Sequence, residues 1–256
     1  MVNSLIVLGV LTRYLTAAIL ALALLSCSGE NPQSPSKQTA EKQATEKPPP
    51  AYVSLGDSLA VGVGASDPEA RGYAALYREA LAEEARREVR FVQLGVSGET
   101  SESFIGYPQR DSSQLALAET ALKRYPGAMV TLSLGANDLL RTADATDAER
   151  EAAIARYGQN LDYILKRLGG ASDPEPRIAV LALYNPAPGS FTDEWVGWLN
   201  REIRAVSEAN GASVAAGDRA FRGHEREYIH YPGDIHPTDK GYAALARAFE
   251  RATGVA

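Results

Sequence analysis

The chain has a single cysteine, Cys27, and no cluster of basic residues. One cysteine cannot form a disulfide within the chain, which excludes a small disulfide-stapled scaffold. The net charge is −6, whereas a nucleic-acid-binding protein would need clustered Lys and Arg to neutralise phosphates. What is present is a chain of 256 residues, of which 45% are hydrophobic. This length and composition allow one domain with a sizeable core and additional segments.

Charged residues are scarce at the start of the chain. Nearly every residue from Leu5 to Leu25 is apolar, apart from Arg13 and a few small polar residues, and the run ends in LLSC at 24–27. This order is typical of a secretory signal, and its ending resembles the lipobox of bacterial lipoproteins. The resemblance implies a signal peptide over 1–26, lipidation of Cys27 and export to the periplasm or the cell exterior. An uncleaved membrane anchor and a soluble secreted protein are the alternatives.

Large apolar residues are absent from the next segment. The sequence NPQSPSKQTAEKQATEKPPP, which ends at Pro50, holds no apolar residue larger than Ala. Such a segment cannot bury enough surface to offset its ordering entropy. We therefore predict a disordered tether over 27–50, which joins a membrane lipid or anchor to a folded domain over 51–256.

Short apolar runs alternate with longer amphipathic stretches from Ala51 onward. The runs predict strands at 51–55, 89–94, 128–134, 177–183 and, with a weaker pattern, 212–216. The stretches predict helices at 72–87, 112–124, 147–168, 193–209 and 239–253. Cap signals accompany several helices. They are Thr146 with Glu149, Thr192 before Asp193, and Gly127, Gly169, Gly170 and Gly211 after helix ends.

Strands that alternate with helices of this length predict βαβ units and a five-stranded, mainly parallel sheet. Right-handed crossovers place helices on both faces of such a sheet. Ligands bind beyond the carboxyl ends of its strands. The residues that directly follow each strand are therefore the candidates for function.

Three of these positions carry polar or glycine-rich chemistry. Ser58 follows the first strand in GDSLAVGVG, where a hydroxyl can stand at the top of the sheet, although Gly-Asp-Ser is also ordinary turn chemistry. The stretch is not the G-x-S-x-G elbow, because Ala60 stands in place of its second glycine. Gly98 in GVSGETS allows close backbone approach, or simply a turn. Asn137 in GANDLL can stabilise an oxyanion, or cap a helix.

The last loop adds a candidate base. The chain has three histidines, His224, His230 and His236, and the last of them lies in GDIHPT. A serine hydroxyl needs a base to become a nucleophile, and the base needs a third group to orient it. A serine, backbone and amide donors, and a histidine together make the combination that acyl transfer requires.

The chain resembles the GDSL, or SGNH, hydrolases. The matches are GDSL at 56–59, GVSGETS at 95–101, GAND at 135–138 and HPTDKGY at 236–242. They occur in the family's order and span nearly all of 51–250. The resemblance implies a flavodoxin-like, three-layer α/β/α fold. It also implies that Ser58 is the nucleophile and His236 the base. The implied oxyanion hole consists of the Ser58 N–H, the Gly98 N–H and the Asn137 amide, with Asp57 supporting the turn.

Two positions depart from the family pattern. Gln93 stands where the second motif often begins with Asn, at a position we take to be structural. The family's acid usually lies three residues before the histidine, but that residue here is Gly233, and Asp234 lies two before. We predict that a turn at Pro232–Gly233 lets Asp234 orient His236. The alternatives are Asp218, Glu225, Glu227 or a Ser-His dyad.

Other polar and aromatic residues favour structural roles. His224 and His230 lie near Asp218 and Asp234, but their spacing matches no zinc pattern, so no metal is expected. Trp195 and Trp198 have ordinary core spacing on a helix, and an acyl pocket is the alternative use for one of them. The segment NPAPG at 185–189 is a candidate rim for the substrate cleft.

We therefore predict a serine hydrolase of carboxylic esters, an esterase or lipase, with a lysophospholipase-like activity as one form of it. It needs no cofactor, and its expected partner is a small-molecule acyl ester, with no nucleic acid. We expect a monomer. A carbohydrate O-acetylesterase or a thioesterase are the alternative enzymes. A binding protein without turnover is the alternative of another class, and its only support is the displaced acid at Asp234.

Overall fold

A computed structural model describes residues 50–106 and 112–255, and the predicted signal peptide, Cys27 and nearly all of the predicted tether lie outside them. Its sheet has five parallel strands in the order β2-β1-β3-β4-β5. The strands are β1 Ala51–Gly56, β2 Arg90–Gln93, β3 Met129–Ser133, β4 Arg177–Ala182 and β5 Ser213–Ala216. All five predicted strands are confirmed, and the mainly parallel sheet is parallel throughout.

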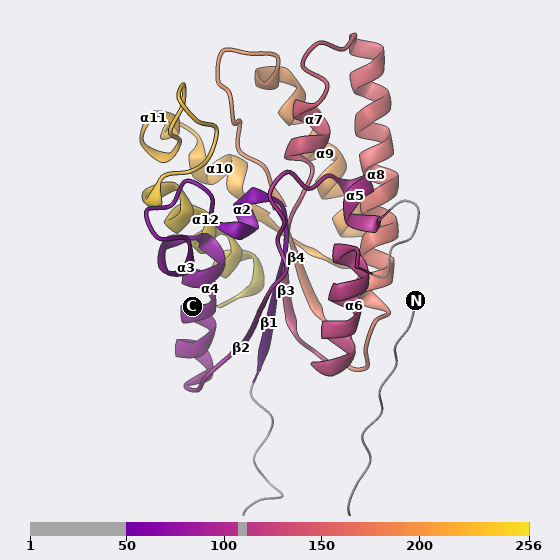
Figure 1. Ribbon diagram of the computed structural model, residues 1–256, viewed down its shortest axis with the longest axis vertical. Helices are drawn as coiled ribbons and strands as arrows, with labels where there is room; N and C mark the ends of the chain where they lie inside the picture. The colour runs from indigo at the N-terminus through magenta and orange to yellow at the C-terminus, as the bar shows by residue number, and fades with distance from the viewer. Residues whose placement is uncertain (1–49, 107–111, 256) are drawn as a thin grey trace, which may run out of the picture. The chain divides into compact units, whose positions relative to one another are not determined.

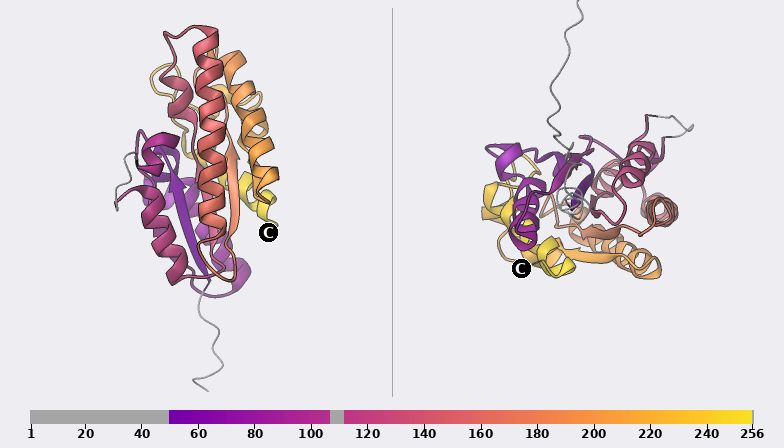
Figure 2. Two further views of the ribbon diagram at one scale, coloured as in Figure 1. Left: turned by 90° about the vertical axis from the view of Figure 1, so that its right-hand side faces the viewer. Right: turned by 90° about the horizontal axis from the view of Figure 1, so that it is seen from below.

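Helices cover both faces of the sheet, as the three-layer prediction requires (Figures 1 and 2). Helix α4 packs against α12 on one face, and α8 packs against α9 on the other, where α6 contacts β1. These long helices are α4 Tyr73–Ala85, α6 Gln114–Arg124, α8 Asp147–Gly169, α9 Thr192–Ala209 and α12 Asp239–Thr253. Within the described ranges no helix is long and apolar enough to cross a membrane.

Short helices lie around the carboxyl edge of the sheet, where Figure 1 shows α2, α5, α7 and α10 beyond the upper ends of the strands. They are α2 Ser58–Val61, α3 Pro68–Arg71, α5 Ser101–Ile105, α7 Ala136–Leu140, α10 Gly217–Phe221 and α11 Glu225–Tyr228. The sequence pattern does not indicate them, because a helix of four or five residues is too short to display a 3.6-residue repeat.

The helix termini test the predicted caps. The capping box of Thr146 and Glu149 at the start of α8 is confirmed. The cap at Thr192 is wrong, because Thr192 lies inside α9 and bonds Asn185 instead. Gly127 and Gly211 have the left-handed backbone expected after a helix. The prediction is wrong for Gly169 and Gly170, because Gly169 is the last residue of α8 and Gly170 has a φ of −80°, which is not left-handed.

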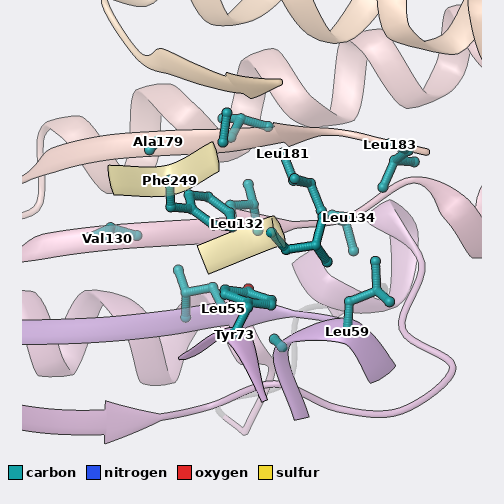
Figure 3. Packing of buried hydrophobic residues seen from close by; sticks show 14 of the residues in the cluster. Leu55, Leu59, Tyr73, Val130, Leu132, Leu134, Ala179, Leu181, Leu183 and Phe249 are labelled. Atoms are coloured by element: carbon teal, nitrogen blue, oxygen red, sulfur yellow. The ribbon is translucent and has the colours of Figure 1, made fainter. Parts of the chain in front are cut away.

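The core lies between the sheet and both helical layers (Figure 3). Strand β3 is buried along its whole length, because β1 and β4 flank it and helices cover it on both sides. Figure 3 shows Leu55 of β1, Leu132 of β3 and Leu181 of β4 beside Phe249 of α12. Apolar runs without polar alternation, as in these strands, are typical of a parallel sheet buried on both faces.

Truncating the central strand should destabilise the domain. Leu132 is fully buried, so Leu132→Ala leaves a cavity and should lower the free energy of unfolding by about 2–5 kcal/mol. Leu117→Ala is the matched control, because that leucine is 45% exposed and its loss should cost less than about 1 kcal/mol. Urea unfolding measures both, and equal losses would contradict this placement of the core.

Candidate active site

Ser58 is the first residue of α2, directly after β1. The Asp57 carboxylate caps this helix by accepting a hydrogen bond of 3.0 Å from the Leu59 N–H. Gly56 has a φ of +125°, and a Cβ there would lie 1.9 Å from the Ser133 carbonyl oxygen. The turn therefore requires glycine at 56 because β3 runs directly beneath it. The predicted role of Asp57, support of the turn, matches this geometry.

Ser58, His236 and Asp234 lie in one chain of hydrogen bonds. The Ser58 Oγ is 2.9 Å from His236 Nε2, and His236 Nδ1 is 2.6 Å from Asp234 Oδ1. A carboxylate only accepts, so Nδ1 carries a proton and Nε2 of the neutral ring is left to accept from the serine hydroxyl. This is the tautomer that a general base requires.

A turn brings the displaced acid to the histidine, as predicted. Gly233 and Asp234 both donate their N–H groups to the His230 carbonyl, at 3.1 and 3.2 Å. Asp234 Oδ1 also accepts from the His236 N–H at 3.2 Å. Partial burial acts to raise the pKa of Asp234, but the hydrogen bonds from His236 outweigh it and lower that pKa. The carboxylate therefore stays ionised beside the imidazole.

The alternative acids have other partners. Asp218 pairs with Arg204 at 2.7 Å, and Glu227 pairs with Lys240 at 2.5 Å. Glu225 accepts from the Gly223 N–H at 3.0 Å. Of the acids weighed in the sequence, Asp234 is the one that reaches His236.

Asn137 is the second residue of α7, the short helix that follows β3. Its Nδ2 donates to the Glu99 carbonyl at 2.9 Å, which ties α7 to the loop that contains Gly98. An amide nitrogen carries two hydrogens, so one remains for a ligand. Gly98 has a φ of +82°, and a Cβ there would meet nothing within 4 Å, so the space beside its Cα is open.

An apolar cavity opens beside Ser58, Asn137 and His236. Most of its lining is aliphatic, namely Leu59, Ala136, Leu139, Leu140, Leu183, Pro186, Val196 and Ile235. Pro186 belongs to the predicted rim segment at 185–189.

Trp195 is buried in the core, and Trp198 is 44% exposed. Neither tryptophan lines the cavity, so the acyl-pocket alternative for them is wrong, and Val196 between them lines it instead.

The other two histidines have separate contacts. The His224 ring stacks on Tyr228 with 4.9 Å between ring centroids. His230 Nε2 lies 2.9 Å from the Gly64 carbonyl, which ties the loop after α2 to the loop of His236. In the part of the chain that the structure describes, no group of three His, Cys, Asp or Glu side chains is placed to hold a metal ion.

Asp57 is a buried carboxyl that forms no ion pair with any residue the structure describes. Burial raises its pKa to about 7, although the hydrogen bonds from Leu59 and Ser133 act to lower it. Its Oδ2 has no hydrogen-bond partner among residues 50–106 and 112–255. The folded domain therefore holds a proton on Asp57 over a pH range in which the unfolded chain has released it.

Two residues near Ser58 escaped the sequence analysis. Glu99 is buried one position after Gly98, and Gln114 is buried at the start of α6. The position of Glu99 inside the motif GVSGETS could have marked it as a site residue. Gln114 offered none, since a glutamine in the first turn of an amphipathic helix is usually solvent-exposed.

The family comparison covers most of the domain. The model of the GDSL-like lipase/acylhydrolase family matches residues 54–244. A curated relative, the spore germination lipase LipC of Bacillus licheniformis, is 28% identical over 214 residues, which cover 78% of this chain and 95% of that protein.

Solved structures share the fold. The lipase Lip_vut3 from a goat rumen metagenome superposes with a TM-score of 0.66 at 26% identity, covering 80% of this chain and 98% of that one. Axe2, an acetylxylan esterase of Geobacillus stearothermophilus, gives a TM-score of 0.62 at 17% identity, covering 80% and 94%. At that lower identity the likeness supports the fold alone.

The proton on Asp57 should make stability depend on pH. The carboxyl has a pKa of about 7 when folded, against an ordinary value of 3.8, so the unfolded chain loses this proton first. Stability should therefore fall as pH rises from about 4 to 7, by up to about 4 kcal/mol for this group, and then level off. Asp57→Asn keeps a capping oxygen and should flatten that slope in urea unfolding at pH 4.5, 5.5, 6.5 and 7.5. Asp144→Asn is the matched control at an exposed aspartate, and parallel slopes for wild type and Asp57→Asn would contradict the prediction.

Proposed function

The chain belongs to the GDSL-like lipase/acylhydrolase family, and from this premise we propose that it is a serine hydrolase of carboxylic esters that works through an acyl-enzyme on Ser58. Ester hydrolysis in general is the activity that the family and its lipase relatives support. The observation that carries the proposal is the hydrogen-bonded chain of Ser58, His236 and Asp234 at an apolar cavity.

The proposed reaction begins at the Ser58 hydroxyl. His236 Nε2 takes its proton as Oγ attacks the ester carbonyl carbon, and Asp234 stabilises the imidazolium that forms. The carbonyl oxygen becomes an oxyanion, which accepts hydrogen bonds from the N–H groups of Ser58 and Gly98 and from Asn137 Nδ2. The C–O bond to the alcohol then breaks, and His236 returns the proton to the leaving oxygen.

Water completes the cycle by the same path. It enters as the alcohol departs, gives a proton to His236 and attacks the acyl carbon of the ester on Ser58. The second tetrahedral intermediate uses the same donors and releases a carboxylic acid, with the proton returned to Ser58. No step needs a metal or an organic cofactor.

The cavity lining favours an apolar acyl group over a polar one. Its walls are mainly Leu, Val, Ile and Pro side chains. A hydrocarbon chain buried against them loses no hydrogen bonds, whereas a polar acyl group would lose those it makes to water. The displaced acid does not support the alternative of a binding protein without turnover, because Asp234 Oδ1 lies 2.6 Å from His236 Nδ1 despite its shifted position in the sequence.

Removing the nucleophile should abolish turnover. We expect Ser58→Ala in the full chain to lower kcat on p-nitrophenyl esters by at least about 10³-fold, because no other group forms the acyl-enzyme. Asp234→Ala should lower kcat by roughly 10²- to 10⁴-fold, since His236 loses the partner that fixes its tautomer. Glu225→Ala, a neighbouring carboxylate bonded elsewhere, is the control and should retain wild-type activity.

Each result separates the alternatives. Full activity in Ser58→Ala would refute the nucleophile, and full activity in Asp234→Ala would favour a Ser-His dyad. The rate profile from acetyl to palmitoyl esters distinguishes an acetylesterase from an enzyme for longer chains. A folded wild type without activity on any ester, whose Ser58 also fails to react with an organophosphonate, would support the binding protein.

We propose further that the mature protein is a lipoprotein anchored through Cys27 and exposed outside the cytoplasmic membrane. The support is the sequence alone: an apolar run after Arg13, the LLSC ending, and a polar segment before the domain. Because acyl-CoA is a cytoplasmic thioester, this location favours an oxygen ester as the substrate.

Lipidation should depend on the single cysteine. In a bacterial host fed a radiolabelled fatty acid, the wild-type chain should incorporate label and sediment with membranes. Cys27→Ser should lose the label, because serine offers no thiol for lipid attachment. Ser28→Ala beside it should not change the result, and label retained by Cys27→Ser would refute the modification.

A further inference from the structure

A buried glutamine joins the two loops that flank Ser58. Gln114 Oε1 accepts from the Gly56 N–H at 2.5 Å, and its Nε2 donates to the Gly56 carbonyl at 3.0 Å. The side-chain amide thus pairs with the Gly56 peptide as a residue of a neighbouring strand would. The register of β2 with β1 ends at Ser54 and Gln93. Beyond it the Val96 N–H still donates to the Gly56 carbonyl at 2.9 Å, and the glutamine adds an acceptor for the Gly56 N–H.

The same amide reaches the oxyanion loop. Gln114 Nε2 donates to Glu99 Oε2 at 2.8 Å, and the other Glu99 oxygen accepts from the Ser103 hydroxyl. The Glu99 carbonyl in turn accepts from Asn137 Nδ2. One side chain therefore connects Gly56, two residues before Ser58, with the residue after Gly98 and, through it, with Asn137.

We propose that Gln114 is a positioning residue for this reaction, which through Glu99 sets the separation between Ser58 and the donors of Gly98 and Asn137. This inference rests on the proposed function. Oxyanion donors must lie within about 2.7–3.1 Å of the developing charge, and a displacement of about 1 Å can cost roughly 10²-fold in rate.

The chemistry of the bridge requires an amide at 114 and a carboxylate at 99. Three of the four hydrogen-bonding sites of the Gln114 amide are used on Gly56 and Glu99, and none of these three bonds goes to its own helix. Glu99 is only 7% exposed. A buried carboxylate needs donors, and here they are a neutral amide and a hydroxyl.

The test is an exchange of the two side chains. Gln114→Glu removes the donor and sets two carboxylates against each other, so we expect kcat to fall by about 10- to 100-fold with KM within about threefold. The double variant Q114E/E99Q restores a donor and an acceptor across the bridge in reverse order. It should recover at least about tenfold of the lost kcat.

Affinity for an alkyl boronic acid gives a second readout. This probe forms a tetrahedral adduct with a serine and places an oxygen in the oxyanion hole, so its inhibition constant should worsen in parallel with kcat. Affinity for a carboxylic acid product should stay near wild type. Gln159→Glu, the same change on an exposed face of α8, is the matched control, and thermal melting monitors folding.

The outcomes are separable. Wild-type kcat and boronate affinity in folded Q114E, or a double variant whose loss equals the product of the single losses, would overturn the role of Gln114. If Q114E fails to fold, Glu99→Met alone applies the same test, because it removes both acceptor oxygens from a side chain of similar size. Wild-type protein that neither hydrolyses esters nor binds the boronate would overturn the proposed function, and this inference with it.

Discussion

The close pairing of β1 and β3 is the constraint on which the site depends. Gly56 and Ser133 are paired at the end of the ladder, and the Asp57 N–H continues it by donating to the Ser133 carbonyl at 2.9 Å. This contact leaves no room for a side chain at 56 and ends β1 in a fixed turn. Ser58 is therefore delivered by the rigid centre of the sheet, where positional error is smallest, while its partners come from loops.

The loop after α2 contacts the histidine loop and the start of α12 beside that turn. The Tyr242 hydroxyl donates to the Val63 carbonyl at 2.6 Å, and Asp239 accepts from the N–H and hydroxyl of Ser66. A Cβ at Gly64 would lie 2.8 Å from the Cβ of His236. The histidine loop and the loop after α2 are thus in direct contact, so Ser58 and His236, far apart in sequence, meet at 2.9 Å through packing of α12 and not through local structure.

The sequence predicted the parts of the fold that repeat and the site residues that stand after strands. Five strands, five long helices, and the contact of Ser58, His236 and Asp234 followed from apolar periodicity, chain order and family motifs. Its failures have a common physical origin. Thr192 looked like a helix cap, but its hydroxyl bonds Asn185 instead. Gln114 carried no pattern at all, because its function depends on a peptide distant in sequence and near in space.

In the described part of the chain, three carboxyl groups near Ser58 are held by backbone N–H groups, side-chain amides and hydroxyls and form no ion pair. Asp57 accepts a hydrogen bond from the Leu59 N–H, and Glu99 accepts from Gln114 and Ser103. Asp138 accepts from the N–H and the hydroxyl of Ser101, and burial raises the pKa of Asp138. Each such group costs desolvation energy that an apolar side chain would not. The directional bonds gained in exchange fix the turn of Ser58, the loop of Gly98 and helix α7 relative to one another. A hydrophobic core has no such directionality, which is why polar contacts at the carboxyl edge, rather than further apolar packing, are suited to hold an oxyanion site in place.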